Sequence, residues 1–218
     1  MSAALAVVGK DLRLAWRDRA GWLSAGMFAA IAVLLYSFAF DLAVGDVRPL
    51  LPGVLWTTFL FAGTFAGGQS FHREAEEGTF DALLLSPVPP TVIYLGKATA
   101  NAVALLLIEF SVMALATILF DAALLTAQLT GIVILGTLGS VSLTTLLATM
   151  GASMRARAMV LPIMALPLLV PLLIAAVRAT GASLGLEGGT APWTLLLGVF
   201  ALWSTLLSVL LFPLAVER

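Results

Sequence analysis

Long apolar runs alternate with short polar segments along most of the chain. Each run is close to the ~20 residues that an α-helix needs to cross a hydrocarbon core ~30 Å thick. A helix satisfies its own backbone hydrogen bonds, as the interior of a bilayer requires. We therefore predict an all-α integral membrane protein with six transmembrane helices. The predicted spans are, to within a few residues, 22–40, 50–71, 98–120, 129–151, 157–177 and 192–216.

The main polar interruption lies between the second and third apolar runs, at residues 72–97. It carries a cluster of acidic side chains. Its periodicity predicts a short amphipathic helix over residues 74–85, with Phe80, Leu83 and Leu84 on one stripe. The prolines that follow end this helix, because proline lacks a backbone N–H and restricts the residue before it. We expect this segment to project from the membrane and to be contacted by a soluble partner.

The first twenty residues combine basic side chains with an apolar helical stripe of Leu5, Val8, Leu12 and Trp16. This pattern predicts a helix lying in the membrane interface over residues 1–20. A secretory signal peptide is the alternative. Against it, the charges occupy the whole segment, and no short apolar core with a small-residue cleavage site follows.

The distribution of lysine and arginine predicts the orientation. Nine of the eleven basic residues fall in the N-terminal segment, in residues 72–97, at the start of the fifth span and at the C-terminal end. Only Arg48 and Arg178 fall in the opposite loops. Basic residues concentrate on the cytoplasmic side of a membrane protein. Both termini and the 72–97 segment are therefore expected in the cytoplasm.

Composition supports a membrane protein and excludes several kinds of site. Hydrophobic residues make up 61% of the chain and charged residues 11%, against roughly 45–50% and 25% in soluble domains. Without cysteine there is no disulfide, thiolate metal site or redox motif. No spacing predicts an enzyme site, a resident cofactor or nucleic-acid binding. The single histidine, His72, is a candidate metal or haem ligand, but a lone histidine at a membrane boundary is more often an interfacial residue.

Small residues and one acid stand out within the predicted spans. Gly63 and Gly67 form a small-xxx-small surface that permits close helix packing, either within the chain or between subunits. Glu109 lies about 18 Å along a helix beyond Lys97, well inside the hydrocarbon. An acid at this depth usually faces the bundle interior or a wet cavity. A structural role and a pathway or coupling role both remain open.

Three prolines, Pro162, Pro167 and Pro171, fall within the fifth predicted span. Each removes a backbone donor, so this helix is predicted to be kinked or interrupted. A static kink and a moving gate are the two interpretations. We further expect this helix and Glu109 to be neighbours, with the freed carbonyls lining a cavity around the acid.

Several segments together resemble the CcmB family, the membrane subunit of the cytochrome c maturation ABC transporter. The resemblance covers nearly the whole chain. It rests on Phe71, Glu74, Gly78, the runs 83–87 and 94–97, the Pro-Gly-Val-Leu-Trp sequence at 52–56, and the run 166–174.

The resemblance implies a single permease domain over residues 1–218, of the ABC-2-like exporter type, in the bacterial inner membrane. It implies ATP hydrolysis by a separate CcmA-like ATPase, haem as a possible cargo, and CcmC-like, CcmD-like and CcmE-like partners. A homodimer within the complex is also expected, because such ATPases act in pairs. The expected ATPase-docking residues are Phe71, Arg73, Glu74, Glu77, Gly78, Thr79, Phe80, Leu83, Leu84, Leu85, Ser86 and Pro87.

Two other classes of function remain open at this point. One is an ABC exporter permease for a lipid, a glycan or a drug. The other is a membrane scaffold that transports nothing.

Overall fold

The computed structural model describes residues 8–10, 13, 19–41, 46–76, 88–150, 157–186 and 189–216, and helices are the only regular elements among them. Six long α-helices and one short 3-10 helix account for most of them. The helices are α2 (Arg19–Asp41), η1 (Arg48–Leu50), α3 (Leu51–Glu76), α5 (Pro90–Phe120), α6 (Ala127–Met150), α7 (Arg157–Ser183) and α8 (Ala191–Val216).

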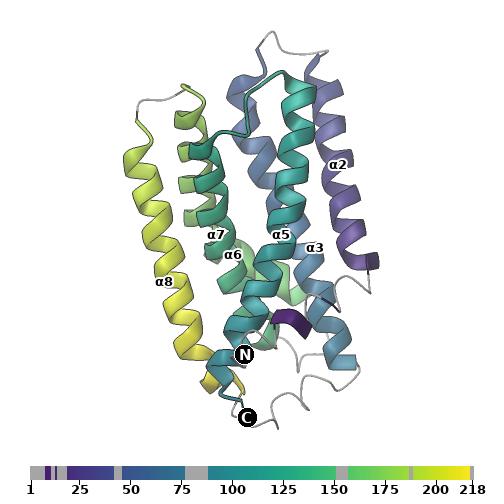
Figure 1. The fold of residues 1–218 in the computed structure, drawn as a ribbon, viewed down its shortest axis with the longest axis vertical. Helices are drawn as coiled ribbons and strands as arrows, with labels where there is room; N and C mark the ends of the chain where they lie inside the picture. The colour runs from purple at the N-terminus through teal and green to yellow at the C-terminus, as the bar shows by residue number, and fades with distance from the viewer. Residues whose placement is uncertain are drawn as a thin grey trace.

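Five of these helices are long and apolar enough to cross a membrane. They contain residues 21–40, 90–120, 127–150, 164–183 and 191–215, so the protein is a multi-pass membrane protein and five predicted spans are confirmed as apolar helices. The helix at the second predicted span, α3, is not among them. It has 26 residues, about 39 Å of helix, and runs alongside the others (Figure 1). A sixth crossing therefore stays a prediction.

The long helices run alternately up and down the bundle (Figure 1). The start of α2 and the end of α8 consequently lie at the same end. The end of α3 and the start of α5 lie there too, whereas residues 46–50 and 121–126 lie at the opposite end. This arrangement agrees with the prediction that the basic segments share one side of the membrane.

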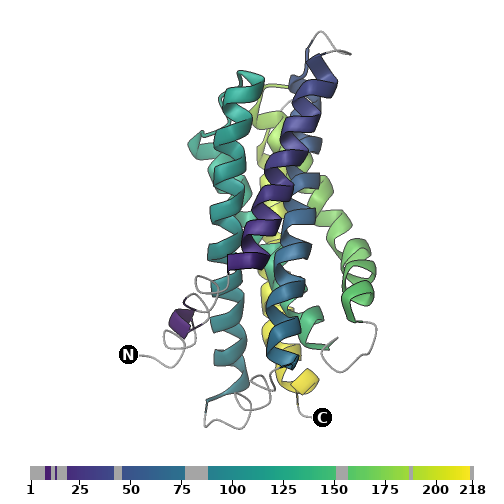
Figure 2. The same cartoon turned by 90° about the vertical axis from the view of Figure 1, so that its right-hand side faces the viewer.

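The central helix of the bundle is α6, which packs against α3, α5, α7 and α8. By contrast, α2 crosses α3 on the outside of the bundle, and much of its apolar surface faces outward (Figure 2). The main core joins Leu55 and Phe59 of α3 to Met113 of α5, Ile132 of α6 and Leu172 of α7. Contacts between residues far apart in sequence therefore hold α6 in place.

The start of α5 corrects the predicted boundary of the polar segment. The helix begins at Pro90, directly after Pro89 in extended conformation (ψ 137°). Proline is favoured at this first helical position, where its missing N–H costs nothing. Ile93 and Tyr94 are then fully buried against Phe212 of α8. Residues 90–97 are thus part of a packed helix rather than a loop.

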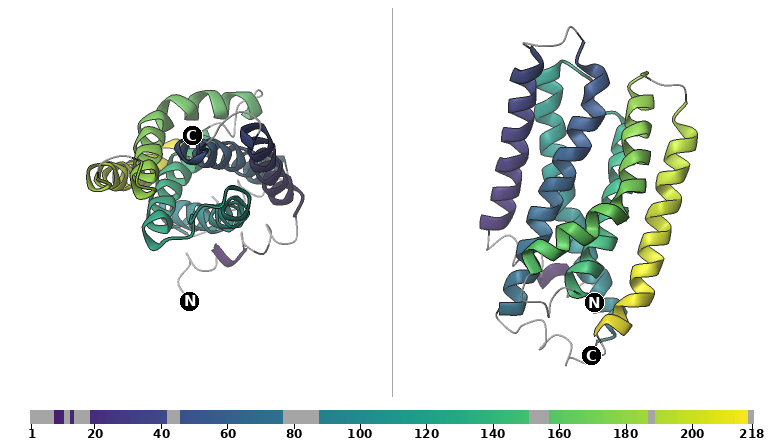
Figure 3. Two further views of the ribbon diagram at one scale, coloured as in Figure 1. Left: turned by 90° about the horizontal axis from the view of Figure 1, so that it is seen from above. Right: turned by 180° about the vertical axis from the view of Figure 1, so that it is seen from behind.

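The proline-rich helix α7 is continuous but bent. Its N-terminal part runs across one end of the bundle, and its C-terminal part runs along the bundle (Figure 3). The predicted kink is confirmed, and no break in the helix accompanies it. The bend carries the two parts of α7 to different neighbours.

Candidate functional site

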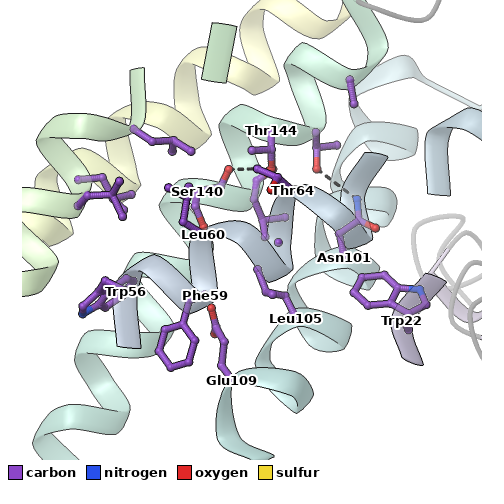
Figure 4. A pocket seen from close by; sticks show the side chains of 17 residues that line it. Trp22, Trp56, Phe59, Leu60, Thr64, Asn101, Leu105, Glu109, Ser140 and Thr144 are labelled. Atoms are coloured by element: carbon purple, nitrogen blue, oxygen red, sulfur yellow. Dashed lines mark hydrogen bonds between the residues drawn. The ribbon is translucent and has the colours of Figure 1, made fainter. Parts of the chain in front are cut away.

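A cavity with several polar side chains lies between α2, α3, α5, α6 and α7. Trp22 of α2 and Trp56 of α3 lie at its two ends, and Glu109 of α5 lies along its side (Figure 4). Its volume open to the centres of water molecules is about 40 Å³. One water needs about 10–15 Å³ by this measure. The cavity therefore has room for a few waters and is far smaller than the 300–1,000 Å³ typical of small-molecule sites.

Hydroxyl and amide groups form the polar part of the cavity lining. Asn101 of α5 donates from Nδ2 to Oγ1 of Thr145 on α6, at 3.3 Å. The hydroxyl of Thr144 donates to the carbonyl of Ser140, at 2.9 Å. Such groups supply the several polar partners that a buried water requires. The polar lining residues are Thr64, Asn101, Glu109, Ser140, Thr144 and Thr145.

Glu109 is buried in the bundle, with only 2% of its surface exposed. Its Oε2 lies 2.5 Å from Oγ1 of Thr137 on α6. Thr137 is itself fully buried and does not line the cavity, whereas Glu109 does. Glu109 therefore contacts both a buried residue of α6 and the cavity. This position agrees with the expectation that the acid faces the bundle interior or a wet cavity.

The α7 helix reaches the same cavity through Leu169, Leu172 and Leu173. Glu109 and α7 therefore line the same cavity, whereas α5 itself packs mainly against α2, α3, α6 and α8. Pro167 and Pro171 are both exposed on the outer face of α7, and the gating role expected for the prolines stays a prediction. They share that face because they are four residues apart. The side chain of Pro162 lies outside the described residues.

Trp56 fixes the end of the cavity by joining three helices. Its Nε1 donates to Oγ1 of Thr180 on α7, at 2.9 Å, and both side chains are buried. The indole ring crosses α6 at Gly136, where a Cβ atom would lie 2.2 Å from the ring. Only glycine leaves room for the ring at this position. Within the Pro-Gly-Val-Leu-Trp segment, the tryptophan is thus the residue that connects α3 to α6 and α7.

Gly63 faces the neighbouring helix within the chain. A Cβ at this position would lie 3.2 Å from the side chain of Leu105 on α5. This contact supports packing within the chain, one of the two uses considered for the small-residue surface. Gly67 is also in α3, but its side-chain surroundings lie outside the described residues.

The side chains of the predicted docking residues all lie outside the described structure. Phe71, Arg73 and Glu74 belong to α3, in a part whose side chains lie outside the described structure, as does His72. Residues 77–87 and most of the predicted interfacial helix at 1–20 also lie outside it. Within the described residues, no group of three or more histidines, cysteines or acids is suited to hold a metal ion.

Several site residues were not predicted from the sequence. In the sequence, Trp56 stands out only as part of the Pro-Gly-Val-Leu-Trp motif, and no residue of the fourth predicted span, 129–151, is singled out. The available signal was the number of Ser and Thr residues in α6, since such side chains form hydrogen bonds between membrane helices. The residues concerned are Trp56, Asn101, Thr137, Ser140, Thr144 and Thr145.

These features define a multi-pass helical membrane protein with a small, mainly apolar cavity that carries a few polar side chains. The chain belongs to the CcmB protein family, which it matches over residues 2–218. The resemblance found in the sequence is therefore confirmed.

Several relatives named heme exporter protein B are similar along nearly their whole length. The Pseudomonas aeruginosa protein is 30% identical over 211 residues, which cover 91% of each chain. The Bradyrhizobium diazoefficiens protein is 28% identical over 204 residues, covering 90% of this chain and 89% of the relative. The Paracoccus denitrificans protein is 28% identical over 215 residues, covering 96% and 94%.

Proposed function

We propose that this chain is the permease-type subunit of an ABC transporter that serves haem export in cytochrome c biogenesis. The observation that carries the proposal is its family membership, together with full-length similarity to proteins named heme exporter protein B. The chain lies in the bacterial inner membrane in this proposal, with both termini in the cytoplasm. The common end of α2 and α8 and the excess of basic residues support that orientation.

A CcmA-like ATPase docks at residues 71–87 in this proposal. The helices on either side of this segment, α3 and α5, end and begin at the same end of the bundle. The segment combines acidic residues with the Leu83-Leu84-Leu85 run, which a short helix cannot bury against itself. ATP is therefore hydrolysed in a separate chain, and this subunit receives the resulting movement.

The subunit passes this movement to CcmC-like and CcmD-like membrane partners, which release a haem-loaded CcmE-like chaperone. The cavity supports transmission rather than passage of haem in this conformation. Its volume is about 40 Å³, and no His, Cys, Met or Tyr is among the described residues that line it. Those four residue types are the usual protein ligands of haem iron.

Co-purification tests the docking step. Leu84→Asp places a charge in the leucine run, and Gly78→Trp adds a bulky side chain to the same segment. Both variants should insert normally, lose the ATPase on purification and fail to support covalent haem attachment to periplasmic cytochromes. Leu125→Asp is the matched control, because Leu125 is 55% exposed in the loop at the other end of the bundle. It should keep the ATPase.

The same assays separate this function from the alternatives. Normal ATPase binding by both segment variants contradicts docking at residues 71–87. Normal haem attachment with an inactive ATPase indicates a scaffold. ATPase stimulation by a lipid, glycan or drug, without any effect on cytochromes, indicates an exporter of another substrate.

A further inference from the structure

The hydroxyl of Thr137 lies between two oxygen atoms. Its Oγ1 is 2.5 Å from Oε2 of Glu109 and 2.8 Å from the carbonyl oxygen of Val133. A carbonyl oxygen only accepts hydrogen bonds, and a hydroxyl has one proton to donate. If Thr137 donates to Val133, the carboxyl of Glu109 must be protonated and donate to Thr137. If Glu109 is ionised, the hydroxyl must turn and donate to the carboxylate.

The two arrangements differ by one proton on Glu109. Both keep the heavy atoms in place, because only the hydroxyl proton of Thr137 changes direction. The buried pair therefore accommodates either protonation state without repacking α5 against α6.

Among the residues that the structure describes, Glu109 is the only ionisable side chain that lines the cavity. α5 packs against α2, α3, α6 and α8, and Tyr36 of α2 is the only titratable group in their described stretches, 21–40, 51–65, 127–150 and 191–215. On α7, residues 164–183 carry Arg178. On α5 itself, Tyr94 and Lys97 lie near the N-terminal end of the helix, away from Glu109. None of these four residues lines the cavity, so water is the medium available to an ionised Glu109.

The cavity has room for that water. It extends along α3 and α5 from Glu109 past Asn101 to Trp22 at the end where α2 begins (Figure 4). Most of its wall is apolar, and the hydroxyl, amide and carboxyl groups on the wall are the polar partners that a buried water needs. Ionisable groups in membrane helices are tolerated where such a wet cavity reaches them.

We propose that Glu109 is a proton-binding site that exchanges its proton with water in this cavity. The O–H bond of the carboxyl breaks and a cavity water takes the proton, giving a hydronium ion and a carboxylate. The Thr137 hydroxyl then turns from Val133 to the carboxylate. Rebinding of a proton reverses both steps. This site does not depend on haem export and would be present in a permease for any substrate.

Infrared difference spectroscopy of the full chain in lipid nanodiscs tests the proposal, with protons and D2O as probes. A C=O band of a protonated carboxylic acid should be present at acidic pH and disappear on raising the pH. It should shift promptly when H2O is replaced by D2O. Glu109→Gln should lack the band. If that variant does not fold, Glu109→Asp should shift it instead.

Substitutions at Thr137 test the hydroxyl. Thr137→Val keeps the shape of the side chain but removes the donor to the carboxylate, so the band should persist to higher pH, by about tenfold in proton affinity. Thr137→Ser keeps the hydroxyl and should titrate like the unchanged protein. A band that is absent at every pH, or one that never shifts in D2O, overturns the proposal. Identical titration of the Val and Ser variants overturns the role of Thr137.

Discussion

At the scale of single residues, the contact between Trp56 and Gly136 is the tightest test of the packing. Gly136→Ala brings a methyl group to within 2.2 Å of the indole ring, and the ring is held by its hydrogen bond to Thr180. We expect a loss of about 1–3 kcal/mol in unfolding free energy, the usual range for overpacking. Unfolding of the purified protein in mixed micelles measures it.

Gly131→Ala is the control for that experiment, because it lies on the same helix with nothing within 4 Å of its Cβ position. Alanine is a better helix former than glycine, so this variant should be at least as stable as the original. Equal destabilisation of both variants would contradict the close packing of the Trp56 ring against Gly136 of α6.

A second residue-scale prediction concerns the role of Glu109 in coupling. Glu109→Gln keeps the size of the side chain and can still hydrogen-bond to Thr137, but it cannot ionise. If Glu109 couples ATP hydrolysis to movement, the variant assembles with its ATPase and loses haem attachment to cytochromes. Full haem attachment by Glu109→Gln, at normal protein levels, would contradict the coupling role and leave Glu109 with a structural role.

At the scale of elements, hydroxyl groups join α6 to α8. Ser142 and Thr205 share a hydrogen bond of 2.8 Å. Ser204 and Ser208 of α8 donate to the carbonyls of Gly139 and Ser142, at 3.3 and 3.1 Å. Tyr94 of α5 also donates to the Ser142 carbonyl, at 3.1 Å. This polar seam gives α6 a fixed register against its neighbours.

A double-mutant cycle on Ser142→Ala and Thr205→Val measures the seam. Each hydroxyl also has a carbonyl acceptor in its own helix. A single substitution therefore changes the unfolding free energy through both contacts, and only the coupling energy of the cycle isolates the contact between the helices. We expect a coupling of about 0.6 kcal/mol, at most about 1.7 kcal/mol. Thr194→Val replaces Thr205→Val in the control cycle. Thr194 bonds only to carbonyls at the start of α8 in the described structure, so its coupling should vanish.

The sequence predicted the helices well and the site only in part. Apolar length is a local property, so five spans were located as helices. Their ends were less exact, since α5 begins eight residues before its predicted span and α7 ends six residues after its own. Glu109 was singled out because a charge in an apolar run is visible in the sequence. Its partner Thr137 was not, since a threonine in a membrane helix signals nothing until the facing helix is known. The prolines of α7 were recognised as a kink, but their outward face depends on which stripe the bundle buries.

At the scale of the whole molecule, the orientation in the membrane can be measured with single cysteines, because the chain has none of its own. Asp46→Cys and Leu125→Cys lie in loops at one end of the bundle, and Val88→Cys lies at the other. A membrane-impermeant thiol reagent added to intact spheroplasts should label the first two. Val88→Cys should be labelled only after permeabilisation. Labelling of Val88→Cys in intact spheroplasts would invert the proposed topology.

The number of copies is a separate prediction for the whole molecule. Two copies are expected, since a pair of ATPases needs a pair of docking segments. Gly63 packs against Leu105 inside the chain, so Gly63→Cys should give no cross-link. Cysteines at the exposed apolar positions of one outer helix should cross-link in the active complex. Leu23, Met27 and Leu35 of α2 and Leu195, Leu202 and Leu210 of α8 are suitable positions. Monomer at all of them would contradict the dimer.

The central place of α6 also bears on how the protein is made. A ribosome delivers α6 to the membrane before α8 exists, although the carbonyl of Gly139 takes its outside donor from α8. The carbonyl of Ser142 has two outside donors, Tyr94 of α5 and Ser208 of α8, and only the second is missing at that stage. During synthesis, the polar groups of α6 that face α8 are therefore exposed to lipid or to the insertion machinery until α8 is inserted. The bundle closes only when α8 arrives. Nascent chains that stall before α8 should thus be natural targets for membrane proteases and chaperones.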